Sequence, residues 1–201
     1  MENQTNRGVF CGYVSAPPQF SHENHGREFY KFFLEVPRLS GAVDILPVVA
    51  AKEVLQTCAV CDGDAVRIEG QIRSFNNRSE EGRKLIVSIY ADSLRPCRDA
   101  PDNDVTLSGI ICKAPNFRRT PLGREICDLM LAVPRHYHRT DYIPCILWGR
   151  TAREAAGSSV GCRLELHGRL QSRTYLKVLD DRTEERTAYE VSAMDAVVWE
   201  K

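Results

Sequence analysis

The chain has 201 residues, of which 43% are hydrophobic and 27% charged, and its 27 Lys and Arg balance 27 Asp and Glu. This composition is that of an ordinary globular protein with one large domain or two small ones. A net charge of zero argues against a strongly basic, non-specific polyanion binder, although a local basic groove remains compatible with it. The N-terminal MENQTNRGVF is not a secretory signal and no apolar run could span a bilayer, so we expect a cytoplasmic protein that binds no membrane.

The first half of the chain is expected to form five strands and one short helix. Runs of β-branched, aromatic and alternating residues predict the strands, and prolines and polar stretches separate them. A loop is expected after the first strand, and a polar hairpin before the fifth. In chain order the strands are 9–17, 29–37, 44–50, 64–75 and 84–94, and the helix is 50–59, between the third and fourth strands.

The second half repeats this order, with strands at 105–115, 126–134, 141–148, 162–175 and 187–197 and a helix at 149–156. The sequence itself also repeats, at a shift of 97 residues and, after one inserted residue, 98. The matching motifs are GRE (26–28 and 123–125), L-x-V-P-R (34–38 and 131–135), and IEGQIRS against LHGRLQS (68–74 and 166–172). We therefore expect two small domains, 1–98 and 105–201, joined by a linker at 99–104.

Five strands with a helix between the third and fourth is the order of an OB-fold, a small Greek-key barrel. We predict an all-β protein with short helices, built from two tandem five-stranded OB-fold barrels.

Motifs for catalysis or metal binding are missing from the sequence. There is no P-loop, nucleophile elbow or H-E-x-x-H, so we do not expect an enzyme. Of eight cysteines only Cys58 and Cys61 form a C-x-x-C pair, whereas a structural zinc site normally needs four ligands. His136 and His138 are two ligands without a third nearby. We expect no metal and no cofactor, and we interpret the cysteines as small apolar residues.

The second half resembles bacterial single-stranded DNA-binding proteins. The resemblance rests on five motifs, N-x-V-x-L-x-G (103–109), F-R-R-T-P-L-G-R-E (117–125), L-A-V-P-R (131–135), D-Y-I-P-C-I-L-W-G-R (141–150) and G-R-L-Q-S-R-T-Y (168–175). The first half is similar to the family more weakly, so the whole chain looks like a tandem version of it. The resemblance implies binding of single-stranded DNA in replication, recombination or repair, in the nucleoid, and suggests a homodimer of tandem chains.

Carried over by motif, the resemblance implies four stacking residues, Tyr137, Tyr142, Trp148 and Tyr175, and a DNA-contacting arginine, Arg118. Rings stack on unpaired bases of any sequence, and cations pair with phosphates. The further candidate cations of the second half are Arg119, Arg135, Arg139, Arg150, Arg169, Arg173 and Lys177. Core packing for Trp148 and a structural role for Arg135, which the first half repeats as Arg38, stay open.

Alternation along a strand places Arg169, Gln171, Arg173 and Tyr175 on one face, with Leu170, Ser172 and Thr174 on the other. We expect Leu164 and Leu166 to line the barrel, with a bulge changing the phase of the strand between them and Arg169.

The first half has Ile45 and Ala51 where the second has Tyr142 and Trp148. Its consecutive rings at 29–33 suggest a strand buried on both faces. We therefore expect the first half to be mainly a support or assembly barrel, with only Phe75 and Arg73 left as candidates for DNA contact.

Two departures from the family affect the partners. The chain ends in VVWEK without the family's acidic tail, so recruitment of replication or repair enzymes through such a tail is not expected. Near-neutral charge and the altered first half also fit a different class of function, an OB-fold adaptor of primosome or conjugation type with vestigial nucleic-acid binding. RNA binding is a third alternative.

Overall fold

The structure is a computed structural model that describes residues 5–79, 82–178 and 183–199. Its first half contains β1 (Asn6–Val14), β2 (Gln19–Asn24), β3 (Arg27–Pro37), β4 (Val43–Ala51), α1 (Lys52–Gln56), β5 (Ala65–Ser79) and β6 (Gly82–Pro96). The second half contains β7 (Asp102–Ile111), β8 (Asn116–Arg119), β9 (Glu125–Pro134), the 3-10 turn η1 (His136–His138), β10 (Thr140–Trp148), α2 (Gly149–Ala156), β11 (Arg163–Val178) and β12 (Thr183–Trp199). Three residues of the expected linker 99–104 thus belong to β7.

Each half closes into a barrel of five strands, as predicted. In the first half β1 pairs with both β3 and β5, β3 with β4, β4 in parallel with β6, and β6 with β5. The second half repeats these pairings with β7, β9, β10, β12 and β11. The loop expected after the first strand differs from the prediction: it contains a short sixth strand, β2 or β8, which pairs with the start of β3 or β9.

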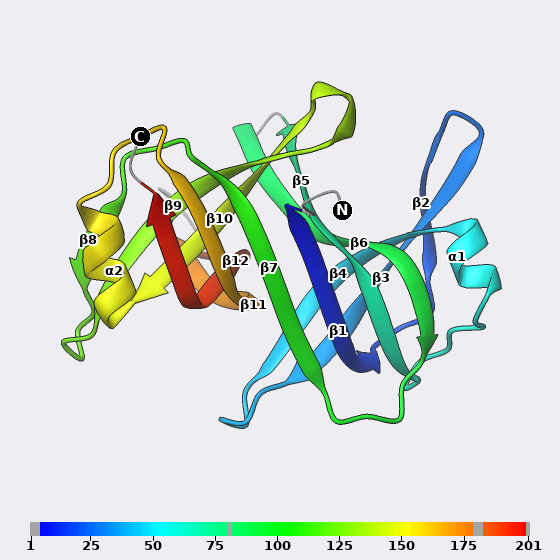
Figure 1. The fold of residues 1–201 in the computed structure, drawn as a ribbon. Helices are drawn as coiled ribbons and strands as arrows, with labels where there is room; N and C mark the ends of the chain where they lie inside the picture. The colour runs from blue at the N-terminus through cyan, green and yellow to red at the C-terminus, as the bar shows by residue number, and fades with distance from the viewer. Residues whose placement is uncertain (1–4, 80–81, 179–182, 200–201) are drawn as a thin grey trace.

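The two barrels are joined through their first strands, which lie side by side in the middle of the molecule (Figure 1). β1 and β7 are antiparallel, with Gly8 opposite Val105. Because these two positions are equivalent in the repeat, the halves are related by a local two-fold axis at this pair. The twelve strands form one sheet, and α1 and α2 lie at opposite ends of it.

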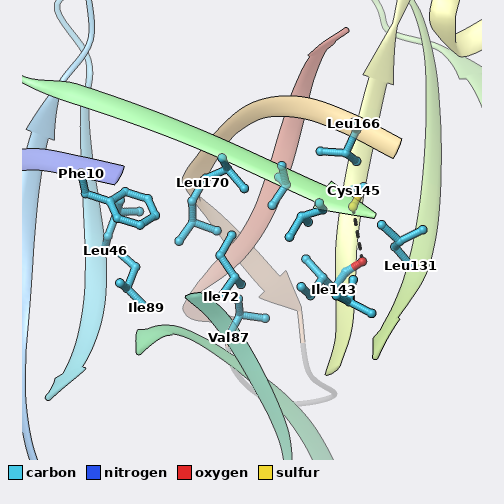
Figure 2. Close-up of a cluster of buried hydrophobic side chains, with 14 of the residues drawn as sticks. Phe10, Leu46, Ile72, Val87, Ile89, Leu131, Ile143, Cys145, Leu166 and Leu170 are labelled. Atoms are coloured by element: carbon cyan, nitrogen blue, oxygen red, sulfur yellow. Dashed lines mark hydrogen bonds between the residues drawn. The ribbon is translucent and has the colours of Figure 1, made fainter. Parts of the chain in front are cut away.

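One apolar core runs through both barrels. Figure 2 shows Phe10 and Leu46 of the first half at one end of the cluster and Leu131 and Ile143 of the second half at the other. Ile72 and Leu170, which are equivalent in the repeat, lie between them, and both are fully buried. The core is therefore shared, and neither barrel is independent of the other.

Two equivalent aspartates fasten the halves together. Asp44 of β4 accepts a 2.8 Å hydrogen bond from the Ser172 N–H of β11, and the Ile45 N–H donates to Ser172 Oγ at 3.0 Å. In the equivalent contact on the other side of the two-fold axis, Asp141 accepts a hydrogen bond from the Ser74 N–H at 2.6 Å. There the Tyr142 N–H donates to Ser74 Oγ at 2.7 Å. Both carboxylates are fully buried and each pairs with an arginine of its own half, Arg38 or Arg135. We call these two contacts the latches.

Candidate nucleic-acid interface

β10 carries two of the expected stacking residues on its outer face. Tyr142 and Trp148 point away from the barrel, with exposed fractions of 44% and 37%, while Ile143 and Leu147 between them are fully buried. The Trp148 ring is anchored at one edge, since its Nε1–H donates to Ser192 Oγ of β12 at 2.9 Å. More than a third of the side chain stays exposed, so the alternative of core packing describes only part of it.

β11 carries the third ring. Tyr175 is 39% exposed, and the Arg173 guanidinium lies over its ring, 5.6 Å from the centroid. The expected change of phase in β11 is wrong: Leu164, Leu166 and Leu170 are all buried on the same side of the strand. A bulge does occur at this place, but its extra residue is Met194 of β12. The bulge brings the strands together at Gly168, where a Cβ atom would lie 2.2 Å from the Ser192 carbonyl oxygen.

The strand registers connect these residues into one surface. Arg118 of β8 lies opposite Ile126 of β9, which lies opposite Trp148 of β10. On the other side of Trp148, its hydrogen-bond partner Ser192 lies opposite Arg169 of β11. Arg118, Trp148 and Arg169 therefore form a row that crosses five strands of the second half. The strands follow in the order β8, β9, β10, β12 and β11, with Arg118 on the first and Arg169 on the last.

Carboxylates accompany the cations of this surface. Arg118 donates to Asp128 at 2.6 Å and 3.2 Å, and this hydrogen bond raises the pKa of its guanidinium, which stays charged. Arg173 lies 3.5 Å from the carboxylate of Glu190, which is largely buried. A phosphate must therefore compete with internal carboxylates for these arginines. This internal pairing is consistent with a chain whose net charge is zero.

The other candidate arginines lie elsewhere. The Arg135 guanidinium pairs with Asp141 and donates to the Ser74 carbonyl, so it belongs to a latch. Arg150 is on α2, where it pairs with Glu154, and Arg119 pairs with Glu125 at the edge strand β8. Arg139 follows η1 and is exposed. Among the candidate arginines, all of which the structure describes, Arg118, Arg169 and Arg173 are those that lie on the surface of the rings.

Two candidate side chains, those of Tyr137 and Lys177, lie outside the described part of the structure. The backbone places Tyr137 in η1 and Lys177 near the end of β11, opposite Glu184.

The aromatic side chains of the first half differ from the expectation that its strand of rings is buried on both faces. Phe29 and Phe32 are buried, but Phe33 is 44% exposed, and Phe75 of β5 is 54% exposed. His22 stacks on Phe29 at 4.9 Å, and Phe29 pairs across the strands with Ala51, the equivalent of Trp148. The sequence comparison missed Phe33 because its ring does not occupy a family stacking position.

The described residues contain no group of three or more His, Cys, Asp or Glu that could hold a metal ion. The eight cysteines are free thiols, and five of them are buried among the strands. The helices α1 and α2 have 5 and 8 residues, so no helix of the described chain could cross a membrane.

Known proteins match both the sequence and the fold. The model of the single-strand binding protein family matches residues 102–198. Single-stranded DNA-binding protein B of Bacillus subtilis is 36% identical over 84 residues, which are 36% of this chain and 71% of that protein. Single-stranded DNA-binding protein 2 of Listeria innocua is 34% identical over 80 residues, and the chain spans half of its length.

The solved structure of the wild-type single-stranded DNA binding protein from Thermus aquaticus superposes on the whole chain. The TM-score is 0.78 at 20% identity, with 98% of this chain and 93% of that chain covered. This likeness confirms the tandem fold across both halves. The sequence matches of the second half, together with this likeness of fold, show that the chain belongs to the single-strand binding protein family.

Proposed function

We propose that the chain binds single-stranded DNA with little sequence preference and protects exposed strands during replication, recombination or repair. The observation that carries the proposal is the row of rings and cations on one surface of the second half. Tyr142, Trp148 and Tyr175 would stack on bases, and Arg118, Arg169 and Arg173 would pair with phosphates. This role would place the chain in the cytoplasm, at the nucleoid, where such strands form.

The chemistry of the ligand suits these residue types. Each base has a flat face that stacks on an aromatic ring, which contributes ~1–3 kcal/mol per base with little dependence on sequence. Arginines that neutralise phosphates release counterions, so affinity falls as salt rises, with a slope of about −0.7 per phosphate for single strands. Three arginines therefore predict a slope of roughly −2. The half at 105–201 is, on this proposal, the principal binding domain.

The test is the binding of a labelled, unstructured single-stranded oligomer to the wild type, Tyr175→Ala and Tyr175→Phe, measured by fluorescence anisotropy at two salt concentrations. We expect Tyr175→Ala to weaken binding by ~1–3 kcal/mol and Tyr175→Phe, which keeps the ring, to bind almost as the wild type does. Absence of binding at low salt would contradict the proposal. It would favour the alternative of an adaptor that binds proteins. Competition by an RNA oligomer of equal length tests the preference for DNA.

We also propose that two chains associate, as a homodimer of tandem chains. Exposed Ile110, Val197 and Trp199 lie on β7 and β12, away from Trp148 and Tyr175, and Ile110 and Trp199 both lie opposite Arg163 of β11. A second copy would cover this apolar surface. Sedimentation equilibrium should give twice the chain mass for the wild type and a lower mass for Ile110→Arg. A wild type that sediments as a single chain would contradict this part of the proposal.

A further inference from the structure

The outer face of the first half has an apolar groove of about 350 Å³ between β3, β4, β5 and β6. Phe33 lies opposite Pro47 across β3 and β4, and Phe75 lies opposite Ile86 across β5 and β6. All four side chains line the groove. Both phenylalanines are about half exposed, although neither belongs to a family stacking position. Exposed rings that line one groove on the outer face of a barrel indicate a binding surface, since a stable fold does not need them there.

The charge of the groove favours an anionic occupant. Lys31 of β3 lines it beside Phe33 and is exposed, and no carboxylate of the described residues is among its lining side chains. The surface of the second half differs, since its Arg118 and Arg173 are paired with Asp128 and Glu190. An apolar groove with Lys31 as the cation among its described lining residues suits a base and its phosphate.

One side of the groove begins next to a contact with the second half. Ser74, the residue before Phe75, bonds both the Tyr142 N–H and the Asp141 carboxylate through the latch. Phe75 therefore follows directly the point where β5 of the first half contacts β10 of the second half. A DNA strand that stacks on Tyr142 and continues across the boundary between the halves would then reach the ring of Phe75.

We propose that the Phe33–Phe75 groove binds unpaired bases of the same DNA strand that the second half holds, with Lys31 on a phosphate. This inference rests on the proposed function and gives the first half a part in binding beyond the expected role of a support barrel. The first half has replaced the family's rings at Ile45 and Ala51 with rings at two other positions of the same face. On this proposal, the DNA strand crosses from Tyr142 to Phe75 and ends over Phe33.

The experiment compares two oligomers: one of about 10 nucleotides, within the site size of one OB barrel, and one of about 30 nucleotides. The double variant Phe33→Ala/Phe75→Ala should bind the long oligomer at least tenfold more weakly and the short one as the wild type does. Phe20→Ala is the matched control: Phe20 is exposed on β2, packs edge-on against Tyr30 and does not line the groove. Thermal melting shows whether each variant folds, and Phe33→Tyr/Phe75→Tyr, which keeps both rings, should restore binding.

Photo-crosslinking provides a direct readout. A long oligomer containing 5-bromodeoxyuridine should crosslink to the tryptic peptides that contain Phe33 and Phe75. If the wild type binds DNA and Tyr175→Ala weakens binding, but the double variant binds both oligomers normally and these peptides stay free of DNA, the groove does not bind the strand. That outcome overturns this inference, would favour an apolar peptide as the occupant, and leaves the proposed function standing. Failure of the wild type to bind either oligomer overturns both.

Discussion

The outer faces of the two halves differ far more than their frameworks. In the second half the face combines Tyr142 and Trp148 with arginines that are paired to carboxylates. In the first half Ile45 and Ala51 take the places of those rings, and Phe75 takes the place of Arg173. Two copies of one unit have thus kept the same barrel while their surfaces diverged. The first-half face is more apolar, and its exposed rings Phe33 and Phe75 lie at positions where the second half has Met130 and Arg173.

The identical positions of the repeat, in contrast, support the framework. Asn6 Nδ2 donates to the Ile72 carbonyl at 2.7 Å, and its Oδ1 accepts from the Ile72 N–H. Asn103 makes the same pair of bonds to Leu170. The two aspartates of the latches are likewise identical. Identity between the copies therefore marks groups that satisfy buried backbone, and divergence marks the surfaces that meet other molecules.

The largest effect is expected from breaking the latches. Asp44→Ala and Asp141→Ala each remove the buried carboxylate that accepts from a serine N–H of the other half and pairs with an arginine. Loss of one partner of a buried pair costs about 3 kcal/mol or more. We expect both variants to lower the free energy of unfolding by similar amounts in urea denaturation. A large loss in only one of them would contradict the equivalence of the halves.

An exchange of side chains between the two faces should move binding in opposite directions. Tyr142→Ile gives the second half the side chain of the first and should weaken binding of a single strand by ~1–2 kcal/mol. Ile45→Tyr adds a ring at the equivalent exposed position and should strengthen it by a smaller amount. Anisotropy titrations at one salt concentration measure both. Equal affinities for the two variants would show that this position does not contact bases.

The smallest effect should come from releasing a paired arginine. Glu190→Gln removes the carboxylate 3.5 Å from Arg173 and should tighten strand binding by up to about fivefold, the range of a partly exposed ion pair. Glu165→Gln is the matched control, because Glu165 pairs with Arg163 at the other end of β11. Weaker binding by Glu190→Gln would mean that the carboxylate positions Arg173 for the ligand.

The sequence predicts the tandem barrels because alternation, prolines and the repeat all indicate the same strand order. It also predicts the outward face of β11, since Arg169, Arg173 and Tyr175 keep one phase along the strand and Leu170 the other. The role of Arg135 depends on Ser74, a residue of the other half, so no local pattern reveals it. The groove escapes prediction for a similar reason: Phe33 and Phe75 lie on different strands and line one groove only once the barrel has closed.

The most direct test uses the two tryptophans of the chain as reporters. The variant Trp199→Phe leaves Trp148 alone on the candidate surface, and Trp148→Phe leaves Trp199, which lies under Arg163 at the end of β12. Addition of a single-stranded oligomer should quench the fluorescence of Trp148 and leave that of Trp199 unchanged, and added salt should reverse the quenching. Binding of the oligomer without any change in the fluorescence of Trp148 would place the strand elsewhere and contradict the account.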